Sequence, residues 1–163
     1  MRRVMRVVIA AVFILGVAGT AQAQVVRFTA NLSGNQETPA PGILTGAFGT
    51  ATVTLDLGSR TVTWNIDVFN MPSGTNNAHF HVGGPGVAGP TVVNIAFPAN
   101  ISNDFNLSGS ANASFAGFTA RPDQGIRSWD DFMQSLMGGQ MYLNIHSAVN
   151  TGGEIRGQVI REP

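Results

Sequence analysis

The chain has 163 residues, with nine arginines and no lysine against nine acidic residues, so its formal net charge is zero. It contains no cysteine, which excludes disulfide bonds, thiolate metal sites and thiol nucleophiles. Beyond the first 23 residues the six remaining arginines are scattered and form no basic, aromatic-rich stretch, which argues against nucleic acid and anionic membranes as partners.

Residues 1–23 have the pattern of a secretory signal peptide. Three arginines open the segment, an uncharged apolar run covers residues 7–18, and Ala-Gln-Ala at 21–23 fits a cleavage site. An uncleaved anchor is the alternative, but the apolar run is shorter than the roughly 20 residues that span a bilayer. We therefore predict a single mature domain over residues 24–163 that is periplasmic or secreted and has no membrane span.

The mature part of the chain has the composition and the periodicity of a β protein. It is rich in Gly, Thr, Val and Asn, and apolar residues recur at every second position. In chain order we expect strands over residues 27–33, 50–57, 61–69, 77–83, 91–97, 106–118, 142–147 and 154–161.

One short helix is expected near residues 128–138. Ser128 and Asp131 resemble a capping box, and Gly138 is suited to end the helix. Together the elements predict an all-β fold, a two-layer antiparallel β-sandwich with this helix as a structural lid. The strand alternation places eight large apolar residues inside it: Phe28, Val53, Leu55, Trp64, Ile66, Phe80, Leu143 and Ile145.

All three histidines of the chain lie on the polar faces of two expected strands. His79 and His81 alternate with apolar neighbours in one strand, and His146 does so in another. Two imidazoles at this spacing can converge on one cation, and a third from a neighbouring strand would complete a site for copper or zinc.

Several segments of the mature chain resemble the CHRD domain, a module named after chordin. They are the strand and turn over residues 28–39, Ala-His-Phe-His at 78–81, Tyr-Leu-Asn-Ile-His at 142–146, and Gly-Gly-Glu-Ile-Arg-Gly-Gln at 152–158. The resemblance implies a Greek-key or immunoglobulin-like sandwich in an extracytoplasmic setting. It implies much less about biochemical role.

Two functions remain open from the sequence. The first is a non-enzymatic binding or structural module with an extracellular protein or matrix partner, in which the histidines join a polar network with Glu37, Glu154 and Arg156 that holds the loops. The second is a copper or zinc protein that uses the three histidines. If such a protein were an enzyme, we would expect redox activity like that of a superoxide dismutase. No catalytic residue is assigned, because His146 and its neighbour Ser147 point to opposite faces of a strand.

Overall fold

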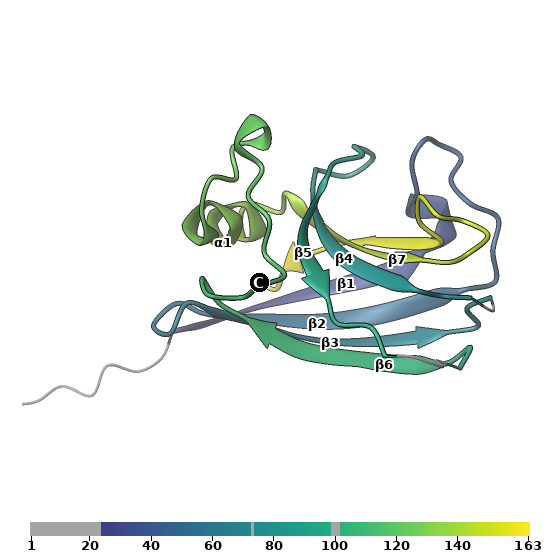
Figure 1. Cartoon of the computed structure of the whole chain (residues 1–163), viewed down its shortest axis with the longest axis horizontal. Coiled ribbons are helices and arrows are strands. Elements are labelled where there is room, and N and C mark those ends of the chain that lie inside the picture. Colours follow the sequence, from purple (N-terminus) through teal and green to yellow (C-terminus); the bar gives the residue numbers. More distant parts are fainter. Residues whose placement is uncertain (1–23, 73, 99–101) are drawn as a thin grey trace, which may run out of the picture.

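The structure, a computed structural model, describes residues 24–72, 74–98 and 102–163, so the expected leader at 1–23 lies outside the described residues. Within them the chain forms nine strands, one α-helix and two short 3₁₀ turns (Figure 1). The helix expected from the sequence is α1, Trp129–Met137. The strands are β1 (Val25–Ser33), β2 (Phe48–Asp56), β3 (Thr61–Phe69), β4 (Asn77–Val82), β5 (Thr91–Ile95), β6 (Phe105–Ala111), β7 (Met141–His146), β8 (Ile155–Gln158) and β9 (Ile160–Arg161), and the 3₁₀ turns are η1 (Gly34–Gln36) and η2 (Pro122–Gln124).

The expected two-layer sandwich is wrong, because all nine strands belong to one antiparallel sheet that is nearly closed into a barrel. Its strands run in the order β5-β4-β7-β8-β1-β2-β3-β6, and β9 also pairs with β1. A sandwich needs two separate sheets, whereas β8 pairs with both β7 and β1 and so joins the two halves. The link to β1 is narrow, a single pair between Ser33 and Arg156, so the sheet can bend sharply there.

The gap between the sheet edges β5 and β6 is crossed by the segment that follows β6. Val93 of β5 forms an isolated bridge with Phe118, and the Asn94 amide donates to the Gly117 carbonyl at 2.9 Å. This segment therefore partly replaces the missing strand pairing.

The core fills the space between β4, β5 and β7 on one side and β1, β2, β3 and β6 on the other (Figure 1). All eight residues that alternation placed inside are buried, with at most 3% of their surface exposed. Trp64 packs edge-to-face on Phe80 and Phe115, with ring centroids 5.7 and 6.3 Å away.

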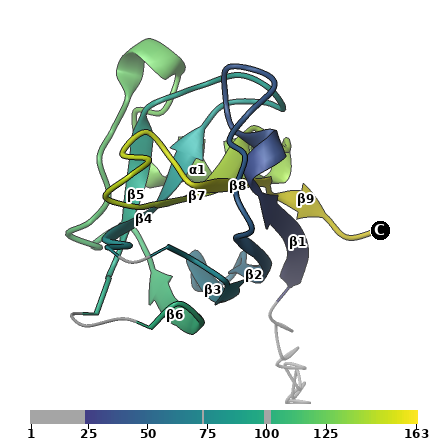
Figure 2. The same ribbon diagram turned by 90° about the vertical axis from the view of Figure 1, so that its right-hand side faces the viewer.

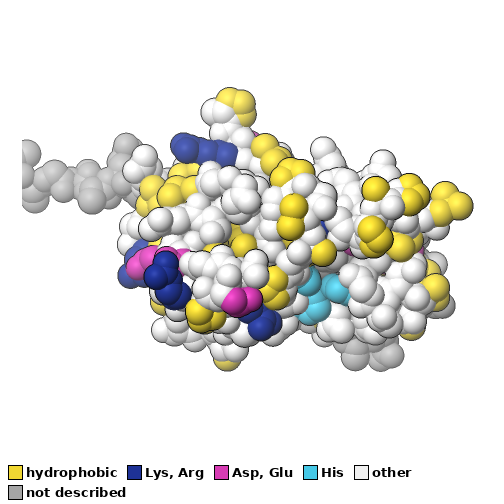
Figure 3. All heavy atoms as spheres, turned by 90° about the horizontal axis from the view of Figure 1, so that it is seen from above, with side chains coloured by type: hydrophobic (Ala, Val, Ile, Leu, Met, Phe, Trp, Pro, Cys, Tyr) yellow, Lys and Arg dark blue, Asp and Glu magenta, His cyan; other side chains and the backbone are white. Residues whose placement is uncertain are grey.

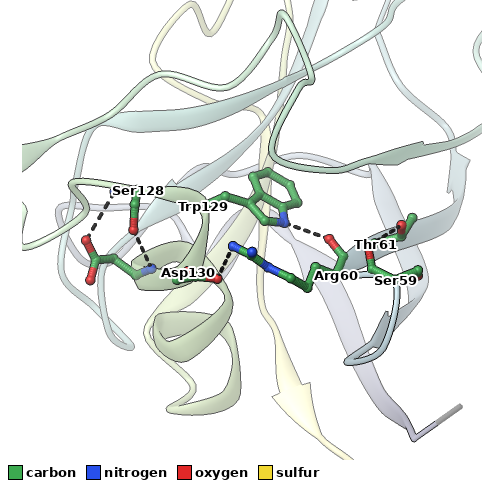
Figure 4. Close-up of polar contacts among 7 residues, drawn as sticks. Ser59, Arg60, Thr61, Ser128, Trp129 and Asp130 are labelled. Carbon is green, nitrogen blue, oxygen red and sulfur yellow. Dashed lines mark hydrogen bonds and ion pairs between the residues drawn. The ribbon is translucent and has the colours of Figure 1, made fainter. Parts of the chain in front are cut away.

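Helix α1 covers one end of this core. Its capping box is present, since the Ser128 hydroxyl accepts from the Asp131 amide and the Asp131 carboxylate accepts from the Ser128 amide. Figure 4 shows how the helix is attached to the β2–β3 turn: the Trp129 indole donates to the Arg60 carbonyl at 2.8 Å, and the Arg60 guanidinium contacts Asp130. The helix is therefore held by the hydrogen bond from Trp129 to the main chain and by packing on the core. The exposed ion pair between Arg60 and Asp130 contributes little to stability.

The opposite, polar face of β4, β7 and β8 is also largely covered. All six residues of β7 and all four of β8 are buried, although alternate side chains point away from the core. Three loops, near residues 35–44, 84–90 and 147–153, lie over this face (Figure 2). None of the helices in the described residues is long and apolar enough to cross a membrane.

Candidate metal centre

Strand register brings the polar side chains of three sequence segments into adjacent positions. His79 of β4 lies opposite Asn144 of β7, and Asn144 lies opposite Arg156 of β8. In the next row, His81 lies opposite Tyr142. These residues therefore share the outer face of the sheet, beneath the three loops.

The three histidines, predicted to lie close together, do so. One ring nitrogen from each of His79, His81 and His146 lies within 4.8 Å of the other two. The closest approach is 3.0 Å, between His79 Nδ1 and His146 Nε2. His79 is partly exposed, and histidine atoms reach the molecular surface in Figure 3, so an ion has access to the cluster.

Loop carbonyls fix the tautomers of two of these rings. His81 Nδ1 lies 2.9 Å from the Gly89 carbonyl oxygen, and His146 Nδ1 lies 2.9 Å from that of Thr151. A carbonyl oxygen only accepts, so each Nδ1 carries the proton, and in a neutral ring Nε2 then keeps a lone pair. Metal-ligating histidines usually donate their second ring N–H in this way.

All three imidazoles are neutral at neutral pH. Burial, helped by the neighbouring His146, lowers the pKa of His79 to about 4. Burial also lowers the pKa of His81 to about 4, against the hydrogen bond to Gly89 and with smaller contributions in the same direction from the other two histidines and Arg156. Burial lowers the pKa of His146 as well, against the hydrogen bond to Thr151. Neutral rings are the form that binds a metal ion.

The cluster is slightly wider than an occupied metal site. Tetrahedral bonds of 2.0–2.1 Å place two ligand nitrogens about 3.3 Å apart. The His79–His146 pair already has a similar separation, and the widest pair would have to close by up to about 1.5 Å from the 4.8 Å limit. Side-chain rotation of the partly exposed His79 can supply part of this closure.

A model of one protein family matches most of the chain. The CHRD domain matches residues 28–159, a range that contains strands β2 to β8 and all of β1 but its first three residues. This chain belongs to the CHRD domain family. No protein of curated function and no solved structure matches it.

Two residues that sequence reasoning assigned to the polar network lie together in this CHRD domain. Arg156 is 1% exposed, and its Nη2 donates to the carbonyls of Gly84 and Val87 at 2.8 and 3.0 Å. Glu37 is 6% exposed and accepts from Asn144 Nδ2 at 3.4 Å. Burial raises the pKa of Glu37 to about 7, although the positive charge of Arg156 and the Asn144 hydrogen bond oppose the shift.

The third residue, Glu154, serves a different part of the CHRD domain. Its Oε2 accepts from Ser147 Oγ at 2.8 Å and from Asn150 Nδ2 at 2.6 Å, which holds the loop between β7 and β8. Among the described residues, no carboxylate is hydrogen-bonded to a histidine; two of the histidines instead bind loop carbonyls through Nδ1. Loop anchoring through Nδ1 therefore leaves Nε2 of His81 and of His146 for other contacts.

Tyr142 connects the histidines to Arg156. Its ring stacks on His81 with centroids 4.9 Å apart and planes 15° from parallel, and the Arg156 guanidinium carbon lies 3.5 Å from its centroid. Its hydroxyl donates to the Gly89 carbonyl and accepts from the Gly89 amide, both at 3.1 Å. The loop carbonyl that orients His81 is thus held in place by Tyr142.

Sequence reasoning did not assign Tyr142, Asn144 or Gln158 to this site. The signal was present: Tyr142 and Asn144 alternate with His146 along β7, and Gln158 follows Arg156 by two residues along β8. Period-two spacing puts each of them on the histidine face.

Proposed function

We propose that this CHRD domain binds one copper or zinc ion through His79, His81 and His146. The observation that carries the proposal is the convergence of three ring nitrogens within 4.8 Å. The domain would act as a non-enzymatic binding module, and it would do so outside the cytoplasm, as the leader and the family resemblance predict.

The hydrogen bonding of the rings leaves nitrogen lone pairs turned toward one another, where an ion can bind them. His79 Nδ1 and His146 Nε2 face each other at 3.0 Å, and His146 Nε2 carries a lone pair because Nδ1 is the protonated nitrogen. The free nitrogen of His81 has only a long contact, 3.4 Å, to the Thr91 hydroxyl. Without an ion, His79 Nδ1 donates to His146 Nε2, and a cation would replace that proton and bind one nitrogen of each ring.

The donor set supports copper or zinc over a hard cation. Imidazole nitrogen suits both of these ions, whereas calcium and magnesium prefer carboxylate and carbonyl oxygen. Three ligands leave a fourth position for water or another small molecule. Redox turnover at copper would use that position and remains a separate prediction to be tested.

The experiment is a titration of metal-depleted protein with Zn(II), Cu(II) and Cu(I). Binding is measured by calorimetry or by competition with a chelator of known affinity. We expect one ion per chain, and a loss of affinity of at least about 100-fold in His79→Asn and in His146→Gln, because each removes one of three ligands. Gln134→Ala, an exposed change on α1, is the matched control and should bind like the wild type. Circular dichroism checks that the variants fold.

Elemental analysis of protein taken from its native compartment shows which ion is carried. The proposal is overturned if the folded wild type takes up no ion stoichiometrically, or if folded histidine variants bind as tightly as the wild type.

A further inference from the structure

One buried carboxyl group lies between the loop at residues 35–44 and the sheet. Glu37, 6% exposed, follows the turn η1, and its Oε2 accepts from Asn144 Nδ2 of β7 at 3.4 Å. Figure 2 shows this loop above β7 and β8. The hydrogen bonds of the three histidines, among the described residues, do not include Glu37, so this contact is separate from the histidine cluster.

The second oxygen of this carboxyl group lies beside another acceptor. Glu37 Oε1 and Asn144 Oδ1 are both buried, and neither has a hydrogen-bond partner among the described residues. Each lies 2.5 Å from the position that a Cβ atom on Gly153 would occupy, so the two oxygens are separated by at most twice that distance. A carboxylate oxygen and an amide oxygen only accept hydrogen bonds, so without a proton neither can satisfy the other.

A proton on Glu37 Oε1 would remove this conflict. A neutral carboxyl group has one O–H donor, and an amide carries a donor on one side and an acceptor on the other. After a short side-chain rotation, Oε1–H would donate to Asn144 Oδ1 while Asn144 Nδ2 donates to Oε2. The two groups would then form a closed ring of two hydrogen bonds, which gives both buried oxygens a partner, as is the rule for buried polar atoms.

The charges around Glu37 set the pH at which this proton is lost. Burial raises the pKa of Glu37 to about 7, and the negative charge of Glu154 acts in the same direction. The positive charge of Arg156 and the hydrogen bonds that the carboxylate accepts oppose the shift. Tyr142 and the three histidines are neutral near pH 7, because burial raises the pKa of the phenol and lowers the pKa of each ring. The proton is therefore lost near neutral pH.

The ionised side chain has space to turn away from Asn144. Glu37 lines a cavity of about 230 Å³ that reaches Arg156, Gln158 and the loop at residues 85–86. It also lines a second cavity of about 250 Å³, beside the loop at residues 149–153. A water molecule occupies about 30 Å³ in the liquid, so either cavity has room for several. A carboxylate that turns into one of them exchanges the acceptor of Asn144 for the donors of water.

We propose that Glu37 and Asn144 form a proton-dependent latch that holds the loop at residues 35–44 against the polar face of the sheet. With the proton, the carboxyl group and the amide form the ring of two hydrogen bonds and the loop is closed. Without it, the carboxylate leaves Asn144 for water and the loop loosens. The latch does not depend on the metal proposed above, because neither residue is one of the three ligands.

The first test locates the proton by NMR, in metal-depleted protein labelled at the carboxyl carbon of glutamate. The chain has three glutamates, Glu37, Glu154 and Glu162, so the signal that disappears in Glu37→Gln is assigned directly. We expect the side-chain amide signals of Asn144 to shift with the same midpoint, near pH 7, as the carboxyl carbon of Glu37. Asn144 signals that do not follow this titration would overturn the proposal.

The second test compares two side chains of similar size at position 37. The Glu37→Gln side chain can donate to Asn144 Oδ1 and accept from Nδ2 at every pH, whereas the Glu37→Met side chain fills a similar volume and cannot form the ring. The measurement is hydrogen exchange of the Ile43 amide, which closes the loop by donating to the Gly34 carbonyl at 2.8 Å, corrected for its intrinsic rate at each pH.

The wild-type protection factor of Ile43 should fall at least ten-fold from pH 5.5 to pH 8.5, where the ionised form of Glu37 exceeds the neutral form by more than ten-fold. Glu37→Gln should keep the protection at both pH values, and Glu37→Met should lack it at both. Glu162→Gln, the same change at an exposed position, should behave like the wild type.

Two results would refute the latch. One is wild-type protection that is equal at the two pH values. The other is a Glu37→Met variant that protects Ile43 as well as Glu37→Gln does, since burial alone would then hold the loop. Circular dichroism checks that both variants fold, and if Glu37→Met does not, the wild-type titration and the comparison with Glu37→Gln still decide.

Discussion

Glu37→Gln should change how the stability of the domain depends on pH. The carboxyl group is buried in the folded chain, where burial raises its pKa from 4.5 to about 7. Between these two values the folded state holds a proton that the unfolded state has lost. Stability contributed by this group is therefore fully present below pH 4.5 and falls as the pH rises to about 7.

The size of the effect follows from the width of that window. A shift from 4.5 to about 7, at 1.36 kcal/mol for each pKa unit, amounts to about 3 kcal/mol. Glutamine does not titrate, so the variant lacks this loss. The free energy of unfolding of Glu37→Gln, relative to the wild type, should rise by about 3 kcal/mol between pH 4.5 and pH 8.

The measurement is urea unfolding at several pH values, followed by the fluorescence of the two buried tryptophans, in buffers free of metals and amino acids. The three histidines have lowered pKa values, so their contribution acts in the opposite direction and is lost as the pH falls below about 6.5. They titrate in both proteins and cancel in the difference. Parallel curves for the variant and the wild type, within about 1 kcal/mol, would refute the reasoning, and Glu162→Gln should give such parallel curves.

Three further predictions concern the core, the loop before β8 and the leader. Trp64→Ala should lower the free energy of unfolding by about 3–5 kcal/mol in denaturant titration, and a change below about 1 kcal/mol would contradict its place in the core. Gly153→Ala should destabilise the domain by at least about 1–3 kcal/mol, because the new Cβ would lie 2.5 Å from Glu37 Oε1. Gly152→Ala is the control, since its Cβ meets nothing within 4 Å, and an equal loss of stability in the two variants would contradict the structure. Intact-mass measurement of exported protein should give a chain that begins at Gln24, and recovery of the full-length chain from membranes would contradict cleavage.

Much of the local structure could be predicted because it depends on patterns that repeat along the chain. Alternation identified β3 with its observed bounds, Thr61–Phe69, and a capping residue identified the start of α1. The expected strand over 106–118 ends early, at Ala111, because the chain turns at Asn112 to cross the gap between the sheet edges. A period of two shows which side of a strand is buried, but it does not show where pairing stops.

The barrel could not be predicted for a related reason. Alternation does not identify the neighbours of a strand, and β1 is joined to the other half of the sheet by pairs between residues far apart in sequence, Ser33 with Arg156 of β8 and residues 28–29 with β9. The same limit applies to the site. The faces of the three histidines followed from spacing, but the cavity beside Gln158 depends on loops that have no periodic signal.

The loop over Arg156 is bound through its main chain, and this determines which changes it tolerates. Both acceptors, at Gly84 and Val87, are backbone carbonyls, and the Val87 side chain is more than half exposed. A new side chain at Val87 leaves both hydrogen bonds in place. One residue inserted between Gly84 and Val87 would instead move a carbonyl away from the buried Arg156 guanidinium. The exposed side chain at Val87 can therefore be exchanged without loss of these contacts, while the length of the loop from Gly84 to Val87 is fixed by the position of the Arg156 guanidinium.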